Sequence, residues 1–252
     1  MDTAALREDM VDGIEHSMDV DESVSLAMRT VPRHPFVEET PYDNRASDYE
    51  GTTVLAPALA ARMLSALNAT DGDEVLVVGA GVGYTAAVLA ELVGERYVHA
   101  VDIDRQLVYA ARSNLESAGY GGVLVDRRDG ADGLPEYAPF DRILVEAAAI
   151  NPPRKLVAQL ADGGRLVMPM GGPEQTLVSV THEGEIEEKH GPVAFRPLLV
   201  EGEQRSGPTR NRTEREDAER AQPDSGYFAP SGWEQEWIDW DERLSGRQRR
   251  RR

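Results

Sequence analysis

The sequence predicts a doubly wound α/β fold around a mainly parallel, seven-stranded sheet. Two observations support this prediction: strand-like and helix-like patterns alternate from Asp73 to about Val200, and the first strand-like run, EVLVV, is apolar after its first residue. A β-branched, apolar run is typical of a strand that is covered on both faces of a parallel sheet. The expected strands are residues 74–79, 97–102, 122–126, 141–146, 164–169, 176–182 and 195–200, and the expected helices are residues 84–93, 105–117 and 153–161.

Composition divides the chain into an N-terminal segment, a core, a linker and a tail. Residues 1–70 are expected to be helical and loop-like, with helices at 21–31 and 56–67. Residues 71–200 hold the alternating pattern of the α/β core. Residues 201–230 are charged and polar with scattered Gly and Pro, which indicates a linker.

The tail, residues 231–252, has its own pattern. Trp233, Trp237, Trp240 and Leu244 recur at helical spacing, so they share one face of a short helix. Two interpretations remain open: this face docks on the core, or it binds a partner. The arginine-rich end could contact nucleic acid, self-associate or remain solvated.

Charge and cysteine content limit the classes of function. The net charge is −18 at pH 7, and Lys155 and Lys189 are the only lysines. Such a surface predicts a protein of a high-salt cytoplasm, because salt screens the repulsion between carboxylates. The same charge opposes non-specific binding to nucleic acid. No cysteine is present, which excludes disulfides and thiolate chemistry. No signal peptide or long apolar span is found, so we expect no membrane partner.

A glycine-rich loop follows the first core strand and indicates a nucleotide-like ligand. Gly79, Gly81 and Gly83 would allow a tight turn and close approach of the backbone to that ligand. The dinucleotide fingerprint needs a glycine at its sixth position, where this chain has Tyr84. Asp102 ends the second strand, where an acid accepts hydrogen bonds from ribose hydroxyls. A ligand with a ribose but no pyrophosphate fits best, which favours S-adenosylmethionine.

Five stretches in order resemble the protein-L-isoaspartate (D-aspartate) O-methyltransferase family. They are VPRHPFV (31–37), VLVVGAGVGYTAAVLAELVG (75–94), DIDRQLVYAARSNLESAGY (102–120), DGADGLPEYAPFD (129–141) and LADGGRLVMPMG (160–171). The resemblance implies the S-adenosylmethionine-dependent methyltransferase fold. It also implies S-adenosylmethionine as the methyl donor and the carboxylate of isoaspartyl residues in damaged proteins as the acceptor.

The resemblance also implies roles for individual residues. Gly79, Gly81 and Gly83 would line the cofactor, and Asp102 would hold its ribose. The Asp129-Gly130 pair would meet the adenine, and Gln175 matches a glutamine in the C-terminal part of the family's pattern.

The acceptor side departs from the family pattern at two places. The family's substrate loop reads roughly G-x-T-I-S-x-P, and residues 51–57 keep its glycine, its threonine (Thr53) and its proline. Leu55 stands where the family has a serine beside the reacting groups. After the fourth core strand the family usually has V-T-A-A, and Glu146 replaces the threonine. We therefore expect an added negative charge and slow isoaspartyl methylation.

Methyl transfer to a carboxylate needs no strong general base, because the acceptor is already ionised at neutral pH. The sequence accordingly shows no nucleophile elbow, no HExxH helix and no histidine cluster, and no metal site is expected. Two other interpretations remain open. One is a divergent methyltransferase with another acceptor, and the other is a cofactor-binding protein without turnover that acts through its C-terminal helix.

Overall fold

The computed structural model describes residues 3–49 and 51–199, so the linker and the tryptophan-bearing tail predicted above lie outside the described residues. The helices are α1 (Thr3–Ser17), α2 (Glu22–Thr30), α3 (Pro57–Leu67), α4 (Tyr84–Val93), the 3-10 helix η1 (Glu95–Tyr97), α5 (Arg105–Ala118) and α6 (Arg154–Val157). The strands are β1 (Ser47–Tyr49), β2 (Thr52–Val54), β3 (Val75–Val78), β4 (Val98–Asp102), β5 (Leu124–Arg127), β6 (Phe140–Val145), β7 (Leu160–Gly171), β8 (Gln175–Thr181) and β9 (Ile186–Val193).

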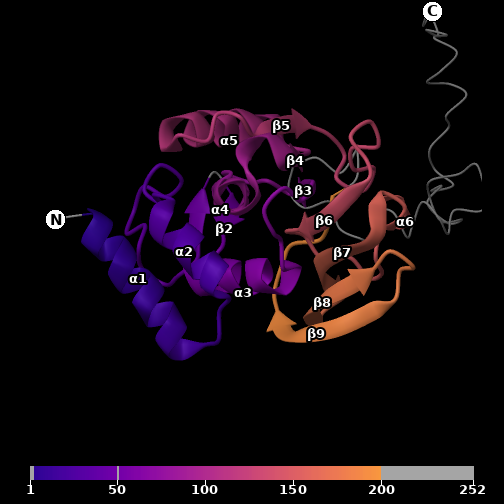
Figure 1. Cartoon of the computed structure of the whole chain (residues 1–252), viewed down its shortest axis with the longest axis horizontal. Helices are drawn as coiled ribbons and strands as arrows, with labels where there is room; N and C mark the ends of the chain where they lie inside the picture. The colour runs from indigo at the N-terminus through magenta and orange to yellow at the C-terminus, as the bar shows by residue number, and fades with distance from the viewer. Residues whose placement is uncertain (1–2, 50, 200–252) are drawn as a thin grey trace, which may run out of the picture. The chain divides into compact units, whose positions relative to one another are not determined.

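Seven strands form one sheet in the order β5-β4-β3-β6-β7-β8-β9 (Figure 1). The five strands from β5 to β7 run parallel, while β8 pairs antiparallel with both β7 and β9. Strand β3 lies in register between β4 and β6, with Val78 opposite Val101 and Val145. This arrangement confirms the predicted fold class.

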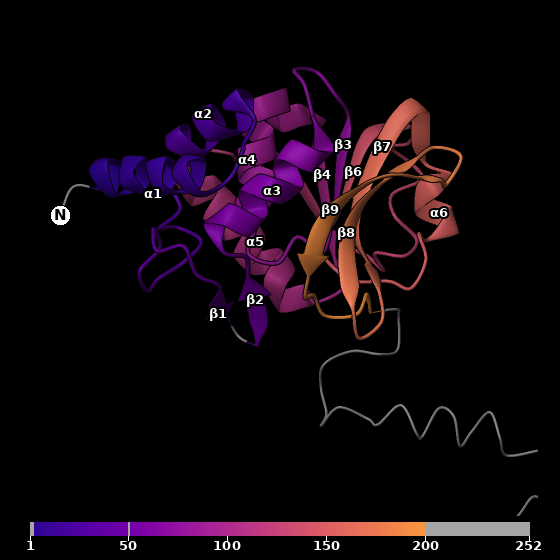
Figure 2. The same cartoon turned by 90° about the horizontal axis from the view of Figure 1, so that it is seen from below.

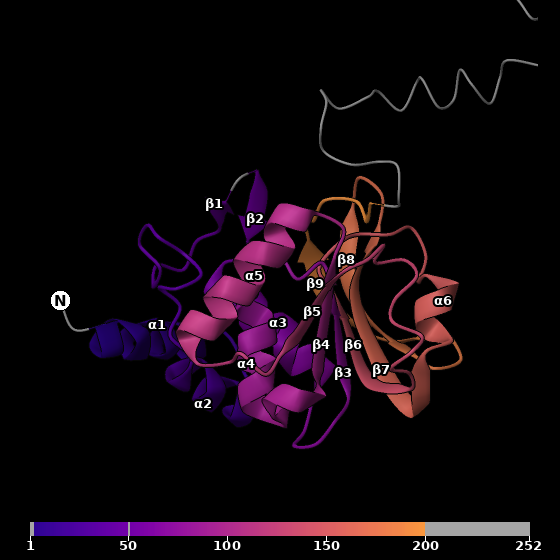
Figure 3. The ribbon, with the colours of Figure 1, turned by 90° about the horizontal axis from the view of Figure 1, so that it is seen from above.

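Both faces of the sheet are buried at β3, which explains why this strand is apolar at every position. Val75 and Val77 join one hydrophobic cluster with α1 to α5, while Leu76 and Val78 join a second cluster on the opposite face. Helices α1 to α5 lie on one side of the sheet and α6 on the other (Figure 2), as the opposite view also shows (Figure 3). Because α6 is short, the loop between β5 and β6 completes that second face through Leu134.

The last strand differs from the prediction. β9 covers Ile186–Val193, not 195–200, where Pro197 makes only an isolated bridge to Ala148. Among residues 3–49 and 51–199, β9 pairs only with β8, and its first four residues are exposed, so its polar sequence gives no burial signal. The helix expected at 153–161 is also shorter, because the chain enters β7 at Leu160.

The N-terminal part contains a hairpin that the sequence did not indicate. β1 and β2 are three residues long and pair antiparallel, with Ser47 opposite Val54. The predicted helix at 56–67 is α3, with Pro57 as its first residue, where the missing N–H costs little. The hairpin and the start of α3 together position residues 51–57, which we call the acceptor loop.

Candidate cofactor and acceptor site

The glycine loop joins the end of β3 to the start of α4. Gly79, Gly81 and Gly83 have φ values of +86°, +52° and +95°, which favour glycine because a Cβ is strained there. At Gly83 an added Cβ would also lie 3.3 Å from Leu115 Cγ on α5. At Gly81 it would meet, among the described residues, only the Gly79 carbonyl oxygen, 3.9 Å away, so these residues leave the loop open on that side. The sequence predicted this strand, loop and helix correctly.

Asp102 ties the glycine loop to the end of β4. Its Oδ2 accepts a hydrogen bond from the Gly81 N–H at 3.0 Å, and its Oδ1 accepts one from the Asp104 N–H at 2.9 Å. Burial raises the pKa of Asp102, while these backbone donors oppose the shift. Asp102 therefore orders the loop whether or not it also contacts a ribose.

The Asp129-Gly130 pair lies beside this edge. The Arg128 N–H donates to the Asp102 carbonyl oxygen at 3.1 Å, which places the start of the pair next to β4. A Cβ added to Gly130 would lie 2.5 Å from Val78 Cγ1, so this glycine packs directly on the end of β3. The structure thus brings together the glycine loop, Asp102 and Asp129-Gly130, as expected for neighbouring strand ends.

Gln175 occupies the first position of β8, and its side-chain amide is paired with backbone. Its Oε1 accepts from the Phe195 N–H at 2.7 Å, and its Nε2 donates to the Phe195 carbonyl oxygen at 3.0 Å. The next residue, Arg196, accepts a hydrogen bond at its carbonyl oxygen from the Ala148 N–H at 2.8 Å. Gln175 therefore fixes the segment after β9 against the segment after β6.

Glu146 follows β6 and faces the glycine loop. Its N–H donates to the Val78 carbonyl oxygen at 2.8 Å, and a Cβ on Gly79 would lie 3.6 Å from Glu146 Cβ. Its carboxyl Oε1 accepts a hydrogen bond from Thr85 Oγ1 on α4. Burial raises the pKa of Glu146 to about 8; the Asp102 charge adds to this shift and Thr85 opposes it. The negative charge expected from the sequence is thus suppressed at neutral pH.

The acceptor loop reaches the same neighbourhood through two arginines. Arg196 donates through Nη1 to the Gly51 carbonyl oxygen, and its own carbonyl oxygen is held by Ala148. Arg33 Nη2 donates to the Leu55 carbonyl oxygen at 2.6 Å. Thr53 is exposed and Leu55 is partly buried. No motif in the sequence indicated the roles of these arginines or of Thr85.

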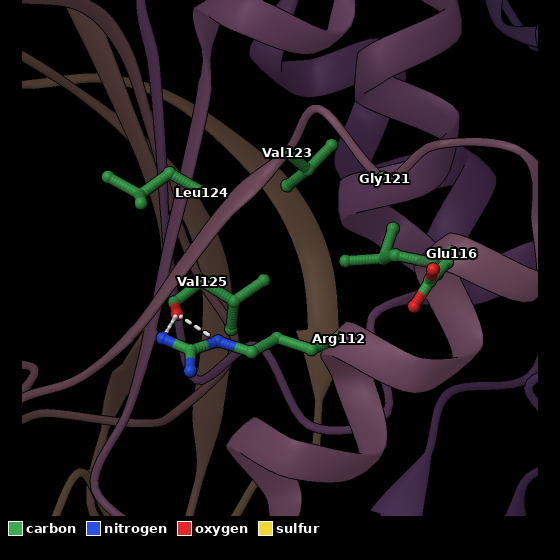
Figure 4. A pocket seen from close by; sticks show the side chains of 7 residues that line it. Arg112, Glu116, Gly121, Val123, Leu124 and Val125 are labelled. Carbon is green, nitrogen blue, oxygen red and sulfur yellow. Dashed lines mark hydrogen bonds between the residues drawn. The ribbon is translucent and has the colours of Figure 1, made fainter.

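A separate hollow of about 420 Å³ lies between α5 and β5 (Figure 4). None of its lining residues belongs to the glycine loop, the end of β4 or the acceptor loop. Arg112 Nε donates to the Val125 carbonyl oxygen at 2.8 Å and so occupies an acceptor on this edge strand. The Gly122 N–H donates to Glu95 Oε2 at 2.7 Å. The Arg112 contact covers part of the sheet edge, which hinders pairing with another strand.

Two kinds of feature are absent from the residues that the structure describes. In this part of the chain, no three His, Asp or Glu side chains gather as a group that could hold a metal ion. No helix there is long and apolar enough to cross a membrane.

Comparisons with known proteins agree with this geometry. The family model described as protein-L-isoaspartate(D-aspartate) O-methyltransferase matches residues 6–203. A protein-L-isoaspartate O-methyltransferase of Aeropyrum pernix is 46% identical over 190 residues, which cover 69% of this chain and 72% of that protein. The enzyme of the same name from Methanosarcina mazei is 41% identical over 205 residues, covering 77% and 83% of the two chains.

Solved structures show the same fold. A structure named protein-L-isoaspartate O-methyltransferase superposes with a TM-score of 0.69 at 25% identity, covering 77% of this chain and 66% of that one. A Plasmodium falciparum structure, described as a candidate member of that enzyme class in complex with S-adenosyl-L-homocysteine, gives a TM-score of 0.67 at 23% identity. The alignment covers 77% of this chain and 98% of that one.

Proposed function

Since the chain belongs to the protein-L-isoaspartate(D-aspartate) O-methyltransferase family, we propose that it transfers a methyl group from S-adenosylmethionine to the carboxylate of isoaspartyl residues in damaged proteins. The observation that carries this proposal is the strand edge where the glycine loop, Asp102 and Asp129-Gly130 meet. The acceptor loop and the segment after β6 are joined to one another by Arg196.

The residues at this edge fit S-adenosylmethionine. We assign the open backbone around Gly81 to the cofactor, Asp102 to its ribose and Asp129-Gly130 to its adenine. Gln175 would act through the segment it holds, because its amide is already paired with Phe195. In the proposed division of the chain, residues 71–200 bind the cofactor and residues 1–70 supply the acceptor loop.

When bound, the cofactor would supply an activated methyl group on a positively charged sulfur. The protein must then hold the acceptor carboxylate in line with that methyl group and exclude water, since no proton has to be removed. Below about pH 8 Glu146 is mainly neutral, so it adds little repulsion toward an anionic acceptor. A neutral carboxylic acid also has an O–H that can donate a hydrogen bond.

The reaction type is tested by the stability of the product. Methyl transferred to a carboxylate forms an ester, which releases methanol in mild base, whereas methyl groups on nitrogen do not. When the methyl group of S-adenosylmethionine carries an isotopic label, we expect the label transferred to an isoaspartyl peptide to be released in mild base. A label that stays on the peptide in base would indicate another acceptor.

Leu55→Ser is expected to raise the initial rate on an isoaspartyl peptide. A hydroxyl could donate to the acceptor carboxylate, and one such hydrogen bond is worth about 1.5–3 kcal/mol, or roughly ten- to 150-fold in rate. Leu55→Ala removes the same bulk without adding a hydroxyl and serves as the control. Equal rates for the serine and alanine variants would show that the hydroxyl does not contribute, and a serine variant slower than wild type would show that leucine belongs to a working site.

We also propose that the protein works in a high-salt cytoplasm, on the basis of its net charge of −18. Salt should screen repulsion among its carboxylates, so the melting temperature should rise steadily up to about molar salt. Thermal melts in a series of KCl concentrations measure this. A melting temperature that does not depend on the KCl concentration would contradict the proposal.

The tail remains a separate proposal. The helical face that the sequence predicts for Trp233, Trp237 and Trp240 is a candidate binding surface for a partner protein. The test uses the full chain and a chain lacking residues 231–252 as baits in parallel pull-downs and compares the amount of other protein that each bait retains. Equal amounts for the two baits would refute a partner role.

A further inference from the structure

We propose that Arg33 is a positioning residue for methyl transfer, and that its buried guanidinium holds the acceptor loop against the start of α4. Arg33 would act through the backbone of the loop and not by touching the reacting atoms. The inference rests on the proposed function for its catalytic consequence, but the contact itself can be tested without any activity.

One side chain contacts both segments. Arg33 Nη2 donates to the Leu55 carbonyl oxygen at 2.6 Å, inside the acceptor loop. Its Cζ lies 4.4 Å from the centroid of the Tyr84 ring, a cation–π contact. Tyr84 is the first residue of α4 and directly follows Gly83 of the glycine loop. Arg33 therefore fixes the acceptor loop relative to the loop assigned to the cofactor.

The surroundings hold the arginine itself in place. The Phe36 and Val37 N–H groups donate to the Arg33 carbonyl oxygen at 3.0 and 3.2 Å, which closes a tight turn. The Phe36 ring packs edge-on against the Tyr84 ring, with 5.6 Å between the ring centroids. The turn therefore contacts the tyrosine that Arg33 also contacts. Arg33 is 1% exposed and has little freedom to adopt another position.

The arginine is poorly arranged for stabilising the fold. Within the described part of the chain, no carboxylate forms an ion pair with Arg33, and its Nε and Nη1 have no hydrogen-bond partner. Burial lowers its pKa, although Tyr84 and Tyr42 oppose the shift. A buried charge that lacks an opposite charge is costly, and apolar replacements of buried ionic groups are often neutral or stabilising. We therefore attribute the position of this arginine to its contacts with the acceptor loop and with Tyr84.

The test compares wild type, Arg33→Met, Arg33→Lys and Arg96→Met. Methionine keeps much of the side-chain length without the charge. Lysine keeps the charge but lacks the planar guanidinium, which can stack on the Tyr84 ring and donate a hydrogen bond to the Leu55 carbonyl oxygen at the same time. Arg96 is the control for the stacking contact, because its Cζ also lies 4.4 Å from a tyrosine ring, that of Tyr97, but this arginine is exposed and belongs to η1. Hydrogen exchange by mass spectrometry follows residues 51–57 and 75–83, alongside thermal melts, S-adenosylmethionine binding and peptide kinetics.

For Arg33→Met we expect faster amide exchange in residues 51–57, unchanged exchange in 75–83 and a melting temperature close to that of wild type. S-adenosylmethionine affinity should change less than about threefold, whereas kcat/KM for an isoaspartyl peptide should fall about tenfold or more. Arg33→Lys should recover part of that loss, and Arg96→Met should match wild type throughout.

Unchanged exchange of residues 51–57 in Arg33→Met would overturn the proposal. So would faster exchange in both segments together with a large fall in melting temperature, because that pattern describes a structural residue. A wild type that methylates no isoaspartyl peptide would refute the proposed function alone. The exchange of residues 51–57 would then still decide the role of Arg33.

Discussion

Asp102→Ala is expected to weaken S-adenosylmethionine binding by about ten- to 150-fold, which corresponds to about 1.5–3 kcal/mol for a lost hydrogen bond to a charged group. The substitution removes the acceptor that holds the Gly81 N–H at 3.0 Å. It also removes the proposed ribose contact. Calorimetric titration of each variant with S-adenosylmethionine measures the effect.

Two variants make this prediction specific. Asp102→Asn keeps an oxygen that can accept the Gly81 N–H but loses the charge, so its affinity should lie between those of wild type and Asp102→Ala. Asp126→Ala removes a carboxylate from the neighbouring strand β5, where it pairs with Arg112, and should bind as wild type does. Equal affinities for all variants, or tighter binding of NAD than of S-adenosylmethionine by wild type, would contradict the cofactor assignment.

The rate on an isoaspartyl peptide is expected to fall as the pH rises through about 8, where Glu146 loses its proton. Ionisation places a second negative charge near the anionic acceptor. At about 6–8 Å and an effective dielectric constant near 20, that repulsion is worth about 2–3 kcal/mol, or roughly thirty- to 150-fold in kcat/KM. The acceptor carboxylate is ionised throughout this range, so its own titration cannot cause the fall.

Glu146→Gln should remove this pH dependence, because glutamine keeps the shape and stays neutral. Glu136→Gln, which alters an exposed carboxylate paired with Arg128, should keep the wild-type profile. The pKa of Glu146 is higher in the folded chain than in the unfolded one, so its contribution to stability is present below the unfolded value and is lost as pH rises through about 8. A wild-type profile that stays flat above about pH 8 would show that Glu146 does not face the acceptor.

The geometry of the candidate cofactor site could be predicted from the sequence because its signals are local. A buried strand, a glycine loop and a helix follow one another along the chain, and α4 covers Tyr84–Val93 as expected. Asp102 ends β4 where the apolar run of that strand stops. Adjacent parallel strands then bring these residues to one edge, which is a property of the fold class.

The acceptor half could not be predicted because it depends on contacts between distant segments. Arg33 meets the Leu55 carbonyl oxygen across 22 positions, and Arg196 meets Gly51 across 145. Glu146 stays protonated because of its burial and because of the charge of Asp102. Neither effect can be inferred from the local sequence VEAA at residues 145–148. Strand β9 was not predicted for a different reason, because an exposed edge strand needs no apolar pattern in its sequence.

The most direct test of the proposed function compares two peptides that differ in one linkage. The same sequence is prepared with an isoaspartyl and with a normal aspartyl residue, and initial methyl transfer from S-adenosylmethionine is measured at about molar salt. We expect methylation of the isoaspartyl peptide and none above background for its aspartyl counterpart. Equal rates for both peptides, or no transfer to either by a protein that binds S-adenosylmethionine, would contradict the assignment of isoaspartyl carboxylates as the acceptor.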